Sequence, residues 1–328
     1  MLLPVDATTK PIPLRKRVQF QLETLVAVAA LRLIPHLPRR MVTRLGRTIG
    51  WLAYYLLPQQ RRLALANLDL AFGSTKTPTD KARIARASSQ NIAATVLAHF
   101  WATRLTRQTL DEIAVADPEG LKLLAALRVK RRATILITLH YGDWELLGLA
   151  TGLYGTHLTI VSRTIRNPLL ENVITRLRKQ SGHEIISSHR AVVKLLKALT
   201  RGDCVALLID QHVALRSGGI WCDFFGVPVL TTPIVARLAQ HSGAAIIGAV
   251  AYPLPDGRLR IVYGPEIRYE PTGDDQADMR NITQQCLQFC EKVIREQPEH
   301  WLWSYKRWKA RPTAEMGRYP YYSVHVRQ

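Results

Sequence analysis

The pattern of apolar and polar positions divides the chain into a helical first part and an alternating remainder. Residues 1–115 read as helical. Within them, Thr77-Pro78-Thr79-Asp80 has the sequence of a helix cap followed by proline in the first turn, which predicts a helix over Ala82–Phe100. From Ala133 onward, short apolar runs typical of buried strands alternate with helical segments. The strand-like runs are Ala133–Leu139, Leu158–Ser162, Glu184–Ile186, Val205–Ile209, Ala244–Ala251 and Arg258–Tyr263.

Helix signals fill the gaps between these runs. Asn167-Pro168 opens a helix expected to end at Gly182, Thr232-Pro233 opens one ending at Gly243, and a third is expected over Gln276–Glu296. Strands separated by helices of about 10–15 residues indicate βαβ units. We therefore predict an α/β fold with a mostly parallel central sheet flanked by helices. The predicted organisation is a helical region over 1–115, an α/β core over 116–312 and a C-terminal tail over 313–328.

Polar side chains follow three of the predicted strands. His140 follows the first, Arg163 the second and Asp210 the fourth. In an open α/β sheet, ligands bind outside the carboxyl ends of the strands. We therefore expect these three residues to converge on one cleft.

The turn after the first strand carries a candidate catalytic pair. Gly142 breaks the apolar run just after His140, and Glu145 follows the histidine by five positions. Asp143 can cap a helix whose first turn holds Glu145, because a short acidic side chain accepts from the free amides there. The turn would then bring Glu145 back to orient His140, as a base that deprotonates an alcohol requires. Asp143 is the alternative carboxylate, and a structural histidine is the alternative reading of His140.

The charge balance of the chain restricts its partners. The 328 residues include 47% hydrophobic and 21% charged positions, which fits a globular protein, but the formal net charge is +20. Such a chain favours anionic partners: nucleic acid, an anionic membrane surface, or an acidic protein or substrate. Nucleic-acid binding predicts aromatic stacking surfaces or a recognition element, and neither is evident. The spacing of the four cysteines indicates no metal site, and no cofactor is expected.

The basic residues concentrate around two short apolar runs near the N-terminus. Glu23 and Arg32 interrupt the first, Phe20–Pro35, and the second is Ile49–Pro58. Both fall short of the roughly 20 apolar residues that cross a bilayer. Short apolar helices flanked by arginine are typical of elements lying in an anionic membrane interface. A helical subdomain with solvated arginines is the alternative. The flanking basic residues are Arg15, Lys16, Arg17, Arg32, Arg39, Arg40, Arg44, Arg47, Arg61 and Arg62.

Several blocks of the chain resemble one acyltransferase family. His140 and Glu145 match the His-x4-Asp/Glu signature of enzymes that acylate glycerol phosphates, lysophospholipids and lipid A precursors. Longer segments are similar to the lipid A late acyltransferases of the lauroyl/myristoyl type. These segments are Asn67–Phe72, Ser162-Arg163 with Asn167-Pro168-Leu169 and Arg176-Leu177-Arg178, Asp210-Gln211-His212 with Gly218-Gly219 and Phe224–Pro228, and Trp301-Leu302-Trp303 with Arg307-Trp308-Lys309 and Arg311-Pro312.

The resemblance implies a reaction and a location. A fatty acyl chain would move from an acyl carrier protein thioester to a hydroxyl of a phosphorylated lipid A precursor, with His140 as general base and Glu145 as its orienting partner. The enzyme would act at the cytoplasmic face of the inner membrane, peripherally or through an N-terminal anchor. Another glycolipid or a lysophospholipid is the alternative acceptor.

The resemblance also implies substrate-binding residues. Arg163 and Arg176 would stabilise the oxyanion or clamp an acceptor phosphate, and Asn167 belongs to the same block. Asp210 would hold one of these arginines in place. Trp301, Trp303 and Trp308, which are interleaved with basic residues, would either form an interfacial belt at the lipid headgroups or pack the C-terminal segment onto the core.

Overall fold

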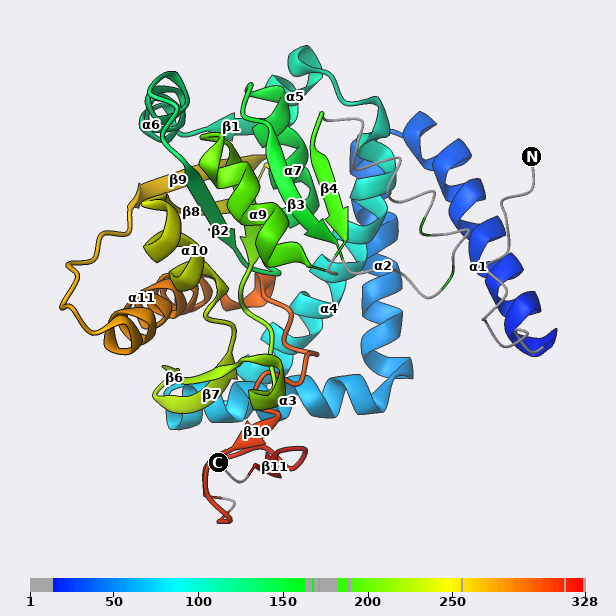
Figure 1. Ribbon diagram of the computed structural model, residues 1–328. Helices are drawn as coiled ribbons and strands as arrows, with labels where there is room; N and C mark the ends of the chain where they lie inside the picture. The colour runs from blue at the N-terminus through cyan, green and yellow to red at the C-terminus, as the bar shows by residue number, and fades with distance from the viewer. Residues whose placement is uncertain are drawn as a thin grey trace.

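A seven-stranded sheet forms the centre of the protein (Figure 1). The computed structural model describes residues 14–162, 167, 171, 182–187, 190–254, 256–315 and 317–326. The strand order is β1-β9-β8-β2-β5-β3-β4, and all neighbours are parallel except the antiparallel pair β8 and β9. The predicted α/β fold with a mostly parallel sheet is confirmed. The strands are β1 Ala114–Ala116, β2 Thr134–Thr138, β3 Leu158–Ser162, β4 Glu184–Ser187, β5 Cys204–Leu208, β8 Ala245–Pro253 and β9 Leu259–Glu266.

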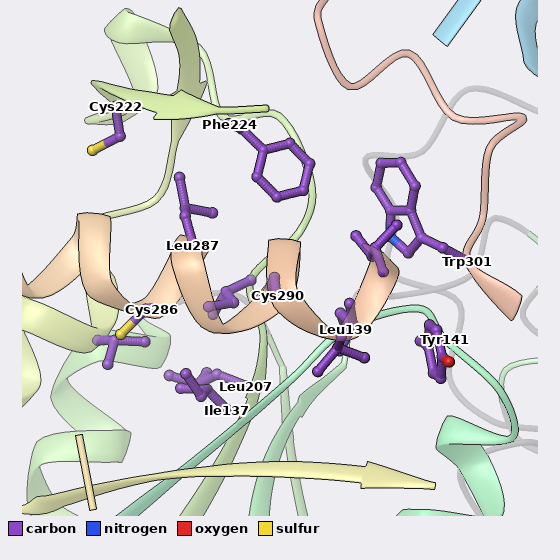
Figure 2. Packing of buried hydrophobic residues seen from close by; sticks show 14 of the residues in the cluster. Ile137, Leu139, Tyr141, Leu207, Cys222, Phe224, Cys286, Leu287, Cys290 and Trp301 are labelled. Atoms are coloured by element: carbon purple, nitrogen blue, oxygen red, sulfur yellow. The ribbon is translucent and has the colours of Figure 1, made fainter. Parts of the chain in front are cut away.

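Helices cover both faces of this sheet because successive strand residues point to opposite sides. Ile135 and Ile137 of β2 join one buried cluster with side chains of α9, α10 and α11, whereas Leu136 joins a second cluster with α5, α6 and α7. In Figure 2, Cys286, Leu287 and Cys290 of α11 are seen with Ile137 and Leu207 of the sheet in the first cluster. The helices are α5 Arg107–Ile113, α6 Pro118–Val129, α7 Trp144–Leu153, α9 Ala191–Thr200, α10 Ile234–Ser242 and α11 Asp275–Glu296.

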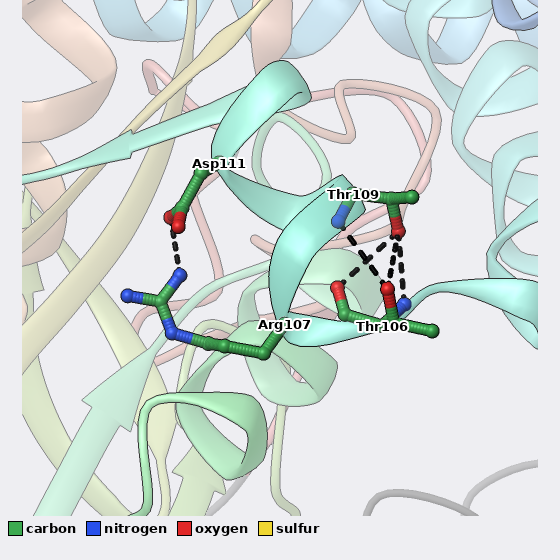
Figure 3. Close-up of polar contacts among 4 residues, drawn as sticks. All are labelled: Thr106, Arg107, Thr109 and Asp111. Atoms are coloured by element: carbon green, nitrogen blue, oxygen red, sulfur yellow. Dashed lines mark hydrogen bonds and ion pairs between the residues drawn. The ribbon is translucent and has the colours of Figure 1, made fainter.

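The N-terminal part is helical, as predicted. Its longer helices are α1 Leu14–Leu33, α2 Arg39–Leu56, α3 Pro58–Phe72 and α4 Pro78–Trp101. Thr77 caps α4 by accepting a hydrogen bond from the Asp80 backbone N–H, although the helix begins four residues before the predicted start. The short helix α5 opens with a capping box between Thr106 and Thr109, and Arg107 pairs with Asp111 across one turn (Figure 3).

One prediction about the N-terminus needs correction. The first apolar run was expected to be too short to cross a bilayer, because Glu23 and Arg32 interrupt it. The structure shows a helical segment over Lys16–His36, and by length and composition it is long and apolar enough to span a membrane. Little of this segment is buried against the rest of the chain, and α1 lies at the periphery (Figure 1).

The C-terminal segment settles the question about the tryptophans. Trp301, Trp303 and Trp308 are at most 1% exposed. Trp301 and Trp308 pack with Phe224, and Trp303 packs with Trp301, so all three belong to the core rather than to an interfacial belt. Asn67 of α3 holds the same segment. Its side-chain amide donates to the carbonyls of two residues of that segment, at 2.7 Å each, and its carbonyl oxygen accepts from a tyrosine hydroxyl; these partners are Trp303, Tyr305 and Tyr322.

The predicted strands are all present, with bounds that differ by at most three residues. Sequence analysis missed β1, the hairpin β6 Ile220–Phe224 and β7 Val227–Thr231, and the two-residue strands β10 Ala310–Arg311 and β11 Val324–His325. Phe225 and Gly226 both have positive φ, which closes the hairpin with a two-residue turn. Most of the helix predicted from Asn167 to Gly182 lies outside the described residues. The remaining elements are the 3₁₀ turns Ile34–His36, Gly73–Thr75, Ala102–Arg104, Leu215–Ser217 and Pro298–His300.

The predicted division into a helical region, a core and a tail stays a prediction. Side chains of the N-terminal helices are part of the same buried cluster as the sheet: Tyr54 of α2, Leu68 of α3 and Ile84 of α4 share it with Ile137 of β2. The cluster therefore extends across the predicted boundary at residue 115.

Helix α2 packs against α4 through two glycines. A Cβ atom on Gly46 would lie 2.5 Å from Cα of Ala94, and one on Gly50 would clash with the backbone of Gln90. We therefore expect Gly46→Ala to lower the free energy of unfolding by about 1–3 kcal/mol, since two helix backbones would have to separate. Urea unfolding of the purified protein in matched detergent measures this.

The matched control for this variant is Gly148→Ala in α7, where an added Cβ atom meets no other atom within 4 Å. There the free energy of unfolding should be unchanged or rise by up to about 1 kcal/mol, as alanine favours a helix. Equal stability of the two variants would show that the close approach of α2 and α4 is not required.

Candidate active site

The carboxylate of Asp210 accepts three hydrogen bonds at the carboxyl end of the sheet. His140 follows β2 and Asp210 follows the neighbouring strand β5. Nδ1 of His140 lies 2.8 Å from Oδ1 of Asp210, the backbone N–H of His140 donates to Oδ2 at 2.9 Å, and Nε1–H of Trp301 donates to Oδ2 at 2.8 Å. The prediction that these two strand ends meet is confirmed for His140 and Asp210.

The C-terminal segment holds the turn that carries His140. The backbone N–H of Leu302 donates to the His140 carbonyl at 3.1 Å, and that of Gly142 donates to the His300 carbonyl at 3.0 Å. From the other side, the hydroxyl of Thr95 in α4 donates to the Gly142 carbonyl at 2.8 Å. The imidazole is thus fixed through its backbone as well as through Asp210.

Burial and charge act in opposite directions on this pair. Burial alone would lower the pKa of His140, but the charge of Asp210, its hydrogen bond and the charge of Glu145 outweigh it and raise the pKa above the ordinary value of 6.5. Burial alone would raise the pKa of Asp210, but His140 and the Trp301 donor hold it below its ordinary value. Asp210 is therefore ionised and accepts the proton on Nδ1, which assigns a lone pair to Nε2 when the ring is neutral.

The second ring nitrogen of His140, Nε2, faces another polar group. Nε2 of His140 lies 3.4 Å from the amide nitrogen of Gln211, and the ring meets Trp144 edge-on with the centroids 5.4 Å apart. His140, Trp144 and Gln211 all line one cavity, so Nε2 is the atom of this pair that is placed to meet a substrate.

Glu145 and Asp143 occupy different positions at the start of α7. Asp143 caps α7 by accepting from the Leu146 backbone N–H at 3.1 Å, and its burial raises its pKa to about 7. Glu145, in the first turn of α7, lies 3.6 Å from Nδ1 of His99 in α4. The charge of Glu145 acts on His140, whereas the hydrogen bond to Nδ1 of the imidazole comes from Asp210, the residue predicted to hold an arginine. A catalytic role of Glu145 stays a prediction.

The predicted substrate-binding block is only partly described. Arg163 and Arg176 lie outside the described residues. Asn167 is described: its amide nitrogen donates to the Phe20 carbonyl and to Oε2 of Glu23, at 3.0 Å each. Asn167 is 1% exposed, so its side chain fastens its segment to α1. Its expected role in substrate binding stays a prediction.

A cavity of about 510 Å³ extends from His140 between α7 and the sheet. Near His140 its wall is polar, with His99, Glu145 and Gln211. The rest of the wall is mainly aliphatic, and it includes Leu136, Leu147, Leu149, Leu158, Ile160, Val161, Ala206, Leu208 and Ala249. The shape and lining suit an extended apolar group whose reactive end lies at the imidazole.

His183 closes part of the cavity wall without being a candidate for catalysis. Its Nδ1 accepts from the Leu158 backbone N–H at 3.1 Å, and its Nε2–H donates to the Gly148 carbonyl at 2.8 Å. Burial, mainly, lowers the pKa of His183, so the ring is neutral and both nitrogens are used. This geometry gives His183 a structural role.

Sequence reasoning missed Gln211, Trp144 and Trp301 as neighbours of the imidazole. Two of them had a usable signal, because Gln211 directly follows a residue already placed at a strand end and Trp144 directly precedes Glu145. Trp301 had none, since it lies 161 positions from His140 along the chain. Within the described part of the chain, no group of three or more His, Cys, Asp or Glu side chains is placed to hold a metal ion.

Comparison with known proteins gives a consistent picture. The family described as bacterial lipid A biosynthesis acyltransferase matches residues 15–310. The lipid A biosynthesis palmitoleoyltransferase of Escherichia coli (strain K12) is 29% identical over 290 residues, which cover 86% of this chain and 90% of that protein. The lipid A biosynthesis lauroyltransferase of the same organism is 23% identical over 304 residues, which cover 90% and 94%.

A shorter match involves another class of glycolipid enzyme. The phosphatidylinositol mannoside acyltransferase of Mycobacterium tuberculosis is 27% identical over 132 residues, which cover 39% of this chain and 41% of that protein. The family match, by contrast, extends over most of the chain and includes His140, Asp210 and the tryptophan-rich segment. The resemblance seen in the sequence is therefore confirmed, and the chain belongs to the bacterial lipid A biosynthesis acyltransferase family.

Proposed function

We propose that this chain transfers a fatty acyl chain from an acyl carrier protein thioester to a hydroxyl group of a phosphorylated lipid A precursor. Family membership supports the acyltransferase activity and the class of acceptor. The observation that carries the chemistry is the His140–Asp210 pair at the polar end of an apolar cavity. The net charge of +20 suits both an acidic carrier protein and a phosphorylated acceptor.

In this mechanism His140 acts as the general base. Nε2 of His140 takes the proton of the acceptor hydroxyl while the hydroxyl oxygen attacks the carbonyl carbon of the thioester. The carbon–sulfur bond then breaks, and the imidazolium gives its proton to the departing thiolate. Asp210 holds Nδ1–H throughout and stabilises the imidazolium, as an orienting carboxylate does in other histidine-based sites.

Other residues would act on the charge that develops during attack. The amide of Gln211 is a donor placed beside Nε2. Arg163 and Arg176 remain our candidates for stabilising the oxyanion or clamping the acceptor phosphate, since a guanidinium group suits either task. Glu145 would add to the negative charge that stabilises the imidazolium, and Asn167 would hold the substrate-binding block against α1.

The apolar cavity would hold the acyl chain with its thioester at His140. Gly148 of α7 lines this cavity, and an added Cβ atom there meets nothing within 4 Å. The space at Gly148 would therefore set part of the depth available to the chain.

The enzyme would work at the cytoplasmic face of the inner membrane. The face of α2 that does not contact α4 exposes an aliphatic row, and basic residues flank it. An amphipathic helix of this kind binds an anionic interface. The row consists of Met41, Leu45, Ile49, Leu52 and Leu56, each at least 43% exposed. Helix α1 would add a peripheral or spanning anchor.

Removal of the base tests the proposed reaction. We expect wild-type protein to transfer labelled acyl chains from acyl carrier protein to a lipid A precursor, and His140→Ala and Asp210→Asn to lose about 10²–10⁴-fold in rate. Exposed His241→Ala is the matched control and should retain wild-type activity. Unchanged transfer by His140→Ala would exclude it as the base. Transfer by wild type only to another glycolipid or to a lysophospholipid would replace the proposed acceptor.

Filling the cavity tests the acyl site. Gly148→Leu should shift the preference toward shorter acyl chains, because the leucine side chain occupies volume that the chain's end would use. Each methylene excluded from the cavity is worth roughly 0.8 kcal/mol, or about fourfold in kcat/KM. Competition between carrier-bound acyl chains of different length measures the shift, with Gly148→Ala as a smaller step in the same direction. An unchanged order of preference in both variants would place the chain elsewhere.

Introducing negative charges on the exposed face of α2 tests whether this face binds the membrane. Leu45→Glu with Leu52→Glu should reduce binding of the full chain to phosphatidylglycerol-containing vesicles roughly tenfold or more, because two leucines leave the interface. Val129→Glu, on the 80% exposed side chain in α6, is the matched control. Flotation with vesicles measures the bound fraction. Equal flotation of the double variant and the control would leave α1 as the membrane contact.

A further inference from the structure

Arg307 is a buried cation that the proposed mechanism does not use. The residue is 0% exposed. Its Nη1–H donates to the Leu230 carbonyl in β7 at 2.9 Å, and the guanidinium carbon lies 5.2 Å from the centre of the Phe224 ring. Among the described residues, Nε and Nη2 have no hydrogen-bond partner. A guanidinium remains charged in proteins, so a full positive charge is held here with few direct contacts.

A chain of buried aromatic contacts connects this cation to the active site. Phe224, which Arg307 covers, lies 5.8 Å from Trp301 between ring centres, and Trp301 donates to Asp210. Figure 2 shows Phe224 and Trp301 close together beside Cys290 of α11. The charges of Asp210 and Arg307 both act on the Cys290 thiol. Burial and Asp210 raise the pKa of this thiol, and Arg307 lowers it.

Asp210 and Arg307 are the buried opposite charges of this region. Asp210 is 2% exposed and Arg307 is fully buried, so water does not screen their attraction. Burial lowers the pKa of Arg307, and the charge of Asp210 is the first of the effects that oppose this change. For Asp210, the effects that oppose burial come first from the charge and hydrogen bonds of His140 and from the Trp301 donor, so Arg307 adds to a compensation that His140 leads.

The remaining titratable groups around the pair do not replace Arg307. Burial raises the pKa of the Cys222 thiol to about 11 and leaves it neutral. Burial and the charges of Arg307 and Lys309 lower the pKa of His212 to about 4, so its ring is neutral too. The hydroxyl of Tyr305 accepts from the His212 backbone N–H. On the other side of His140, Glu145 adds a negative charge, which favours the imidazolium further.

We propose that Arg307 is a positioning residue that balances the buried charge of Asp210 and thereby leaves His140 free to be neutral. Without Arg307, the protonated imidazole would be the cation that compensates Asp210. His140 would then keep its second proton, and an imidazolium cannot accept the proton of a hydroxyl. The functional role that we assign to Arg307 rests on the proposed role of His140 as general base. The electrostatic coupling of Arg307 to His140 through Asp210 does not depend on that role.

Titration of the His140 ring measures this coupling without any substrate. Nitrogen-labelled histidine in the full-length protein gives the protonation midpoint of each ring by NMR, and His140→Gln identifies the signal. We expect Arg307→Met to raise the midpoint of His140 by about one pH unit, which is tenfold in the protonation equilibrium. Arg307→Lys should return it toward the wild-type value because the charge is kept. Lys306→Met, which removes an exposed charge next along the chain, should not move it.

Asp210→Asn separates charge balance from a structural effect. If Arg307 acts through Asp210, Arg307→Met should move the midpoint much less in the Asp210→Asn background than in the wild-type background. An equal shift in both backgrounds, or no shift in folded Arg307→Met protein, would overturn the proposal. Should Arg307→Met fail to fold, the wild-type titration decides: a His140 ring that stays doubly protonated throughout the pH range of the folded protein contradicts it.

Transfer assays then connect the coupling to the reaction. If His140 is the base, the acid limb of kcat/KM should move to higher pH in Arg307→Met, and the rate at high pH should recover. A structural defect would instead lower the rate at every pH. A moved NMR midpoint with an unmoved acid limb would keep the charge coupling, remove its link to catalysis and so contradict the role of His140 as base.

Discussion

The carboxylate of Asp210 is the group on which the architecture of the site depends. An ionised carboxylate is tolerated in a protein interior only where charges and donors compensate it. His140 supplies two of these donors and Trp301 the third, so the ends of β2 and β5 and the C-terminal segment must meet at one point. The burial of Trp301 and the backbone contacts around His140 follow from this requirement. A chain that packed its C-terminal segment elsewhere would leave Asp210 buried without its indole donor.

Local sequence predicted the strands and placed polar residues at their ends, because an apolar run and its flanking turn are local features. It could not predict which strand ends are neighbours. His140 and Asp210 are 70 positions apart, and only the strand order puts β5 beside β2. Glu145, five positions from His140, was the partner that local spacing indicated, and local spacing gave no indication that the fold also places it beside His99. The tryptophans were ambiguous for a related reason, since basic neighbours suit an interface as well as a core boundary.

Local sequence did not predict the short elements because each forms only through pairing with another segment. β1 has three residues and exists through its pairing with β9, and the β6–β7 hairpin depends on positive φ at Phe225, where a bulky side chain gives no turn signal. Arg307 illustrates the same limit in side-chain terms. Lys306, Arg307 and Lys309 lie close together in the sequence, which gives no indication that Arg307 is fully buried while the two lysines are exposed.

Helix α4 gives a physical connection between the exposed apolar face of α2, for which we propose membrane binding, and the turn that carries His140. On one side α4 packs directly against Gly46 and Gly50 of α2, with no room for even a Cβ atom between the two backbones. At its C-terminal end, His99 lines the cavity, and Thr95 holds the turn that carries His140. The exposed face of α2 points away from this contact. If that face lies in the bilayer interface, the position of α4 fixes the cavity relative to the membrane, and a lipid acceptor could reach His140 without leaving the interface.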